Sequence, residues 1–284
     1  MNRATRFPKP FVFCVGMTKG GAGKTWWALN LASLLGLSGY RVGAVDLNPQ
    51  HDLAADHGIL MRRGIYPRFD VVAHEIIDAN GLPQPLPDLS GFLACDFIIY
   101  DTPQFLNFPV VRSAWEQCHL MVFPFTEDGA NLKNYVAAVK QYRALANDLA
   151  PIACVPNNVS ALNNAAPLKE LMEVLRLMED LGCDVPRLSQ QHMIDNNPLM
   201  RVQNTRWVYN DRTNSHERKE VKRKFLDNVL LSLEWLLLIA QKYYGPLPAK
   251  SLPEIAVTDP EGVRAALAAE HQGRFGNQPV PAVA

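Results

Sequence analysis

Residues 13–30 read FCVGMTKGGAGKTWWALN, and this stretch joins the end of an apolar run to a glycine-rich turn and the start of a helical pattern. The run Phe11–Val15 has the aromatic and β-branched composition of a buried strand. The glycines of the turn let the backbone curl with its N–H groups inward, where side chains would otherwise block a phosphate. A helix expected over Ala28–Leu35 would point its positive end at the same anion. The stretch therefore predicts a phosphate site between a strand and a helix.

The turn also carries side chains that suit a bound nucleotide. Lys24 can reach the β- and γ-phosphates, and Thr25 offers a hydroxyl to Mg²⁺. The pattern G-x-x-x-x-G-K-[ST] requires glycine where this chain has Thr18, and an additional lysine, Lys19, precedes the glycines. A second cation there could neutralise phosphate charge at its own site or, from a dimer partner, at the facing one. We expect the nucleotide contacts to come from Lys19, Gly20, Gly21, Ala22, Gly23, Lys24, Thr25 and the backbone of Trp26.

The order KGGAGKT at 19–25 resembles the deviant Walker A motif, KGGxGK[ST], of the ParA/MinD (Soj-like) family of ATPases. Two further segments extend the resemblance over about positions 11–160. Arg41–Asp46 followed by LNPQ is similar to the family's Walker A′ segment, DxDPQ, except that Asn48 replaces the second aspartate. FIIYDTP at 97–103 resembles the Walker B segment, hhhhDTP.

The resemblance implies a role for several of these residues. Lys19 would reach across an ATP-sandwich dimer to the partner's phosphates, whereas the plain alternative is a solvated loop lysine. Asp101 would orient Mg²⁺ together with Thr25, and Asp46 would lie near the same metal; an acid at the carboxyl end of a buried strand is also where a doubly wound sheet places its ligand chemistry. The alternative for both acids is a strand-terminal turn or a helix cap.

Asn157 follows a short apolar strand at the position of the family's Asn-Arg pair, which contacts adenine. Asn158 is not the expected arginine, so the resemblance carries the adenine contact to Asn157 only. A turn asparagine is the alternative for this residue.

Asn48 is the sharpest departure from the family pattern. The aspartate that it replaces helps to place and activate the water that attacks the γ-phosphate. An amide can hydrogen-bond a water but can neither accept a proton nor supply negative charge. We therefore expect a catalytic set of Lys19, Lys24, Asp46 and Asn48 that hydrolyses ATP weakly or only with help from a partner. Asp52, nearby in sequence, is a substitute that the sequence leaves open.

The rest of the chain alternates strand and helix patterns. Strands are expected at Arg41–Asp46, Phe97–Asp101, Leu120–Phe125 and Ile152–Val155, and helices at Ala130–Leu145 and Pro167–Leu181. This order predicts an α/β fold of the P-loop NTPase class: a mostly parallel, doubly wound sheet flanked by helices, with right-handed crossovers and a C-terminal helical extension. The expected domains are an N-terminal arm (1–10), the ATPase domain (11–244, including a basic and apolar helix over 215–244) and a flexible Pro/Ala-rich tail (245–284).

Two segments look like additions to that core. A proline-rich stretch between Ile65 and Asp96 is expected to form a surface loop.

The second segment, residues 206–224, is here called the basic cluster. It carries more basic than acidic side chains and is the best candidate for nonspecific DNA contact, because phosphates require only positive charge. A solvated helix face is the alternative, since the run continues into an apolar helix (Phe225–Tyr244) that is expected to dock on the core or support a dimer. The basic cluster contains Arg206, Arg212, Arg218, Lys219, Lys222, Arg223 and Lys224.

Composition bounds the class of protein. Hydrophobic residues make up 48% of the 284 residues, enough for a packed core, and the formal net charge of zero leaves any nucleic-acid contact to a local patch. The five cysteines have no CxxC spacing, so we expect buried, reduced thiols. Neither a signal peptide nor a membrane span is apparent, so a cytoplasmic bacterial protein is expected, associated with the nucleoid if it binds DNA.

Three functional hypotheses remain. The favoured one is a ParA-like ATPase that binds ATP and Mg²⁺, forms a homodimer around them, positions DNA or another cargo, and is released by a ParB-like or adaptor protein. The second is an ATP-dependent scaffold, poor in hydrolysis, that recruits machinery for plasmid maintenance or conjugation. The third is a metabolic reductase or synthetase on the same fold, for which neither cluster-binding cysteines nor a second substrate motif are found. A membrane partner is not expected.

Overall fold

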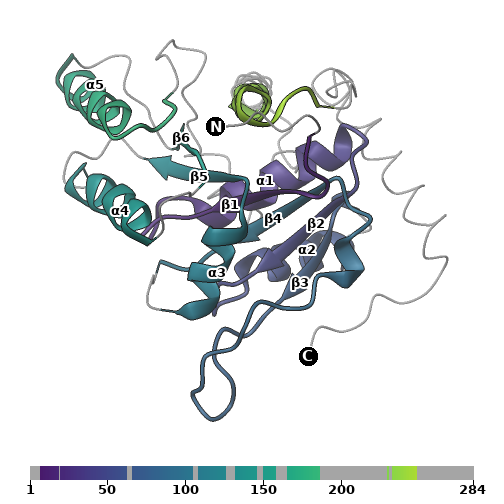
Figure 1. Cartoon of the computed structure of the whole chain (residues 1–284). Helices are drawn as coiled ribbons and strands as arrows, with labels where there is room; N and C mark the ends of the chain where they lie inside the picture. Colours follow the sequence, from purple (N-terminus) through teal and green to yellow (C-terminus); the bar gives the residue numbers. More distant parts are fainter. Residues whose placement is uncertain are drawn as a thin grey trace, which may run out of the picture.

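The computed structural model describes residues 7–18, 20–62, 66–104, 108–125, 132–145, 150–157, 165–185, 229 and 232–247. Its centre is a six-stranded sheet in which every pair of neighbouring strands is parallel, in the order β3-β2-β4-β1-β5-β6 (Figure 1). This arrangement confirms the predicted α/β class with a doubly wound sheet. The strands are β1 (Phe11–Val15), β2 (Val42–Asp46), β3 (Asp70–Ala73), β4 (Phe97–Asp101), β5 (Leu120–Phe125) and β6 (Ile152–Pro156).

Helices cover both faces of the sheet, because successive strand residues point to opposite sides and both sets are apolar. Phe11 and Phe13 join the core of one face, whereas Val12 and Cys14 join the core of the other. The first core contains α1, α2 and a helix over 232–244, and the second contains α3, α4 and α5 (Figure 1). The labelled helices are α1 (Lys24–Leu37), α2 (Asp52–Arg62), α3 (Pro109–Gln117), α4 (Leu132–Leu145) and α5 (Ala165–Asp180), with a 3-10 turn η1 at Ser90–Phe92.

Helix α1 is buried on almost every side. Its side chains pack in one cluster with the sheet and with the helix over 232–244, so that more than one of its faces is covered. Trp26 and Trp27 meet edge to face, with ring centroids 5.4 Å apart, and both indoles lie in this core. The helix begins at Lys24, earlier than the predicted Ala28, because the Lys-Thr pair of the turn already forms its first turn.

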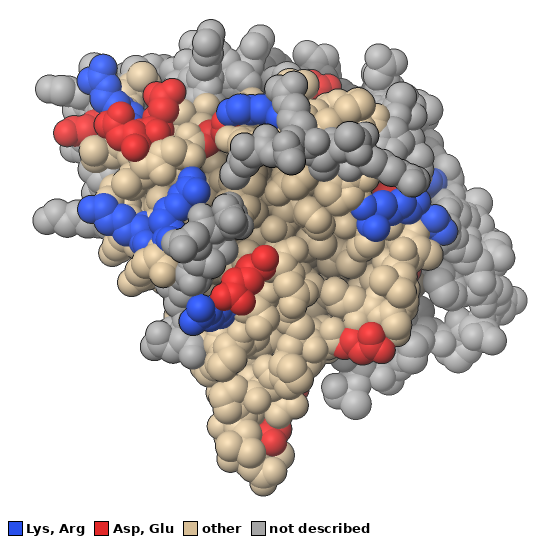
Figure 2. Space-filling model, viewed as in Figure 1, with Lys and Arg blue, Asp and Glu red and all other residues tan. Residues whose placement is uncertain are grey.

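The segment between α2 and β4 only partly matches its prediction. A surface loop is wrong for Asp70–Ala73, which forms the edge strand β3 and pairs with β2. Beyond it, the chain forms an arm that folds back on itself through an antiparallel bridge between Ile77 and Pro83. Figure 2 shows this arm projecting from the body, with few charged side chains on the face in view. The proline-rich part of the expected loop therefore belongs to a structured projection.

The C-terminal helical segment docks on the core as expected. Within the helix over 232–244, Leu233, Leu236 and Leu237 are buried, and Trp235 packs beside them. Lys242 then forms an ion pair of 2.6 Å with Asp184, which follows α5. The basic cluster and the tail from residue 248 onward lie outside the described residues.

Two remaining expectations can be compared with the structure. All five cysteines are buried, as expected, and none of them is paired in a disulfide in the structure. Among the described helices, none has the length and apolar character needed to cross a membrane.

Candidate functional site

The register of the sheet brings the predicted site to one end of three adjacent strands. Val15 at the end of β1 is paired with Asp101 at the end of β4, and Asp101 is paired with Asp46 at the end of β2. The chain leaves β1 toward α1 on one face and leaves β4 toward α3 on the other. Adjacent strands whose connections part in this way open a crevice at their carboxyl ends, which is the usual ligand position in such sheets.

The glycine turn lines this crevice in a conformation that depends on glycine. Gly21 and Gly23 have φ values of 74° and 88°, in the left-handed region, and Gly23 is the N-terminal cap of α1. A Cβ atom on Gly20 would lie 2.6 Å from Oε1 of Gln104, so that side chain lies directly against the turn. The backbone is therefore shaped as a phosphate loop, whereas Lys19 lies outside the described residues.

Lys24 and Thr25 form the first turn of α1, and both are buried. Burial lowers the pKa of Lys24, and the nearby carboxylate of Asp101 opposes that shift. The lysine of the loop thus lies close enough to the Walker B acid for their charges to interact. This placement agrees with the sequence expectation that Lys24, Thr25 and Asp101 share one site.

Asp101 is the most strongly perturbed acid of the site. Burial, together with the negative charge of Asp46, raises the pKa of Asp101 to about 8, while the nearby Thr25 hydroxyl and Lys24 act in the opposite direction. Among the described residues, neither carboxylate oxygen of Asp101 accepts a hydrogen bond. A buried carboxylate of this kind is costly unless a ligand satisfies it.

These features fit a bound Mg²⁺. The ion takes oxygen ligands, usually one or two from the protein, and completes its shell with water and phosphate oxygens. Asp101 with its two orphaned oxygens and the adjacent Thr25 hydroxyl offer such a pair. No cluster of three acidic, histidine or cysteine side chains that could hold a metal occurs in the described part of the chain, so a fully protein-bound metal is not supported there.

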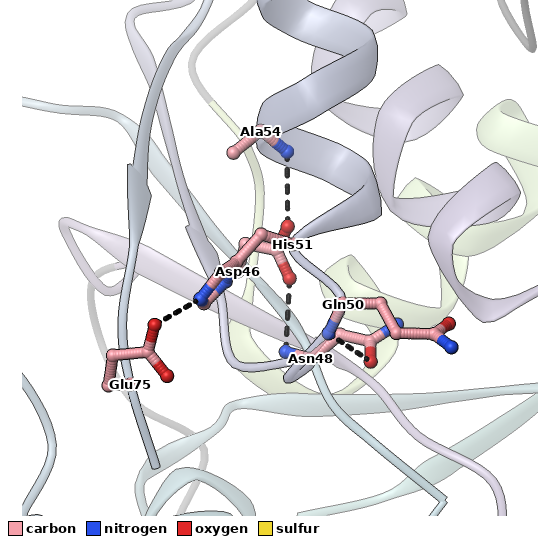
Figure 3. Close-up of polar contacts among 6 residues, drawn as sticks. All are labelled: Asp46, Asn48, Gln50, His51, Ala54 and Glu75. Atoms are coloured by element: carbon pink, nitrogen blue, oxygen red, sulfur yellow. Dashed lines mark hydrogen bonds and ion pairs between the residues drawn. The ribbon is translucent and has the colours of Figure 1, made fainter. Parts of the chain in front are cut away.

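Asp46, in contrast, already has hydrogen-bond donors (Figure 3). Its Oδ1 accepts a hydrogen bond of 3.0 Å from the Asn48 backbone N–H, and its Oδ2 accepts one of 3.0 Å from the Ala54 N–H in the first turn of α2. Burial raises the pKa of Asp46, and these hydrogen bonds oppose the rise. Asp46 therefore fastens the loop after β2, which is the capping role that the sequence left open, and its proximity to a metal remains a prediction.

Asn48 forms hydrogen bonds within the same loop (Figure 3). Its Oδ1 accepts a hydrogen bond of 3.3 Å from the Gln50 N–H, and its carbonyl accepts one of 2.8 Å from the His51 N–H. His51 adopts a positive φ of 48°, and its Nε2 lies 3.0 Å from Oε1 of Glu75, the residue that begins the projecting arm. Sequence reasoning missed His51, Glu75 and Gln104, because no spacing pattern indicates that they meet the loops of the site.

Asn157 closes the crevice from the β6 side. Its side chain is only 2% exposed, and its Nδ2 donates a hydrogen bond of 2.9 Å to the Ala22 carbonyl of the phosphate loop. Sequence reasoning placed Asn157 at the nucleotide site but did not foresee this bond to the loop. The predicted adenine contact stays a prediction.

Comparison with known proteins places this chain in a family. Residues 13–245 match the family model described as the CobQ/CobB/MinD/ParA nucleotide binding domain. The chain is 48% identical over 78 residues to the chromosome-partitioning ATPase Soj of Thermus thermophilus, and 51% identical over 47 residues to a candidate replication protein A of Sinorhizobium fredii. These stretches cover 26% and 16% of this chain and span only 31% and 12% of the two relatives.

Solved structures share the fold at low sequence identity. A candidate plasmid partition protein from Borrelia burgdorferi B31, bound to AMPPNP, superposes with a TM-score of 0.52 at 16% identity, covering 79% of this chain and 99% of the other. The MinC:MinD cell division complex of Aquifex aeolicus gives a TM-score of 0.50 at 13% identity, covering 85% and 99%. These likenesses show the architecture of a P-loop ATPase fold and no more.

Proposed function

This chain belongs to the CobQ/CobB/MinD/ParA nucleotide-binding family, and on that premise we propose that it is an ATP-dependent switch that positions DNA or another cargo. The single observation that carries the nucleotide part is the buried, unpartnered carboxylate of Asp101 beneath the glycine loop, next to Lys24 and Thr25. A buried carboxylate whose two oxygens both lack a hydrogen bond, although Thr25 and Lys24 lie nearby, is explained by a cation that arrives with the nucleotide.

Each residue of the site has a defined task in binding. The N–H groups of the loop and of the first turn of α1 face the phosphates, where the helix dipole adds to their attraction. The Lys24 ammonium neutralises the β- and γ-phosphates, and the Thr25 hydroxyl and Asp101 would hold Mg²⁺ or its water shell. When bound, Mg²⁺ would supply positive charge that offsets the negative charge of the phosphates. The protein itself positions the nucleotide and keeps a buried acid ready for the metal.

Switching is proposed to occur by dimerisation around ATP. The motif at 19–25 has the additional Lys19 that would contact the partner's phosphates, so ATP would hold two copies together. A partitioning role is supported by the matched relative, which is a chromosome-partitioning ATPase, and by the structural neighbour that is a candidate plasmid partition protein. DNA contact by the basic cluster and stimulation by a ParB-like or adaptor partner belong to the same proposal.

Hydrolysis is proposed to be slow without a partner. Asn48 stands where the family pattern has an acid, and its amide oxygen already accepts the Gln50 N–H, so it adds neither a base nor a negative charge to the site. This observation also favours the second candidate function, an ATP-held scaffold that recruits plasmid maintenance or conjugation machinery. The two candidates differ in turnover and in response to a stimulating partner.

Calorimetric titration with ATP tests the nucleotide part of the proposal. Wild-type protein should bind ATP more tightly with Mg²⁺ than with EDTA, because the Asp101 carboxylate can act as a metal ligand only when Mg²⁺ is present. Asp101→Asn should lose most of this dependence on Mg²⁺, because an amide is a poor ligand for Mg²⁺ and only the Thr25 hydroxyl remains. Wild-type affinity that does not respond to Mg²⁺ would contradict the assignment of Asp101.

DNA contact is tested separately with a DNA duplex of arbitrary sequence, where ATP-dependent, salt-sensitive binding is expected.

A further inference from the structure

We propose that Asn157 is a positioning residue that holds the phosphate loop in its binding conformation from the neighbouring strand β6. The inference rests on the proposed nucleotide site and adds to it a residue that acts through the loop backbone. It differs from the adenine contact expected from the sequence, because the Ala22 carbonyl to which its side-chain amide donates belongs to the loop.

Asn157 is anchored at both its backbone and its side chain. Its N–H donates a hydrogen bond of 2.7 Å to the Phe125 carbonyl at the end of β5, which fixes the residue immediately after β6. Its Nδ2 then donates to the Ala22 carbonyl, across 135 positions of sequence, in a fully buried contact. The amide thus links the ends of β5 and β6 to the loop that follows β1.

The approach of Asn157 to the loop is unusually close and depends on glycine. A Cβ atom on Gly23 would lie 2.0 Å from Asn157 Nδ2 and 2.7 Å from its Cγ, closer than any side chain tolerates. Gly23 also has a φ of +88°, which disfavours other residues independently of space. The loop therefore lacks a side chain at the point where the asparagine amide lies against it.

This contact sets the direction of a phosphate-binding N–H group. The Ala22 carbonyl and the Gly23 N–H belong to the same trans peptide plane, in which the two bonds point in opposite directions. Because the Ala22 carbonyl points toward Asn157, the Gly23 N–H points away from Asn157, and we infer that this is the side on which the loop receives its anion. Inward N–H groups are what such a loop uses to bind an anion. Asn157 therefore fixes one peptide of the phosphate cradle before any nucleotide arrives.

The test compares two triphosphates that differ only at the base. ATP and purine riboside triphosphate, which lacks the 6-amino group, are titrated with Mg²⁺ into wild type, Asn157→Ala and Asn157→Leu by calorimetry. Both variants remove the donor without adding charge, and the leucine fills the space. We expect both triphosphates to bind roughly tenfold more weakly, because a freed loop and an unpaired carbonyl cost about one order of magnitude in affinity. The affinity ratio between the two triphosphates should stay at its wild-type value.

A matched control separates this role from general loss of structure. Ser38→Ala removes another buried bond from a side chain to a carbonyl, the 2.8 Å contact from Ser38 Oγ to Leu34 O at the far end of α1. It should leave both affinities unchanged, and thermal melting without nucleotide shows that every variant is folded at the assay temperature.

Two results would overturn the positioning role. Weaker binding of ATP alone would show that Asn157 reads the adenine, and unchanged binding of both triphosphates would show that the loop does not depend on it. A wild-type protein that bound neither triphosphate would instead contradict the proposed nucleotide site, and this inference would fall with it.

Discussion

At the scale of single residues, the site keeps two acids next to each other in a buried place. Asp46 and Asp101 are paired in register at the ends of β2 and β4, and both have raised pKa values, with burial as the first cause. The two acids differ in their neighbours: Asp46 accepts hydrogen bonds from the backbone, whereas Asp101 accepts none within the described residues. Burial of an ionised Asp101 therefore lowers the free energy of unfolding when no ligand is bound.

This cost predicts a pH-dependent stability of the nucleotide-free protein. An unfolded aspartate loses its proton near pH 4, whereas Asp101 in the folded protein keeps it up to about pH 8. Between these values the unfolded state binds fewer protons, so the contribution of Asp101 to the free energy of unfolding is present below pH 4 and is lost as the pH rises to about 8. At pH 8, Asp101→Asn should be more stable than wild type, by on the order of 2–4 kcal/mol.

Urea unfolding at pH 5, 6.5 and 8, without nucleotide or Mg²⁺, measures this effect. The difference between Asp101→Asn and wild type should increase with pH, because titrating groups other than its neighbours Asp46 and Lys24 contribute about equally to both proteins. A difference that does not change between pH 5 and pH 8 would mean that Asp101 ionises normally in the folded protein.

Asn48→Asp is the second residue-scale prediction. The new carboxylate can still accept the Gln50 N–H that Asn48 Oδ1 accepts at 3.3 Å, so the loop should keep its shape. It adds the negative charge and proton acceptor that the amide lacks, and ATP hydrolysis should rise at least about tenfold in a steady-state phosphate-release assay. Asn48→Ala serves as the control and should not exceed the wild-type rate. Equal rates for wild type and Asn48→Asp would show that another group positions the water.

At the scale of elements, strands were more predictable than helices. The bounds of β1, β4 and β5 agree with their predictions, because strands buried on both faces read as continuous apolar runs. The edge strand β3 was missed, since its four residues are mostly exposed and carry little pattern. Helices α2 and α3 were also not predicted: α2 has Gly58 inside its apolar pattern, and α3 is only nine residues long.

The C-terminal helix gives a prediction at this scale. Leu236 is fully buried in the core that contains α1, whereas Leu238 on the same helix is 62% exposed. Leu236→Ala should lower the free energy of unfolding by about 2–5 kcal/mol, because it leaves a cavity against the core. Leu238→Ala is the matched control and should change it by less than about 0.5 kcal/mol. Urea unfolding of both variants decides the matter, and equal effects would show that this helix does not dock as the structure has it.

At the scale of the whole molecule, the parallel sheet explains how much of the site could be predicted. Lys24, Thr25, Asp46, Asp101 and Asn157 come from four separate segments, yet each follows or ends an apolar run. In a parallel sheet these ends meet at one edge, so the sequence was enough to group them. The bonds of Asp46 to its own loop and of Asn157 to Ala22 could not be predicted, because they depend on where side chains point after the strands are in register.

Light scattering of the purified chain with Mg²⁺ and either ATP or ADP tests the central claim, an ATP-dependent switch, most directly. We predict a dimer mass with ATP and a monomer mass with ADP, and Lys19→Ala should bind ATP but remain a monomer, because its ammonium is the group proposed to cross the dimer. A wild-type mass that is the same with ATP, with ADP and without nucleotide would contradict the account.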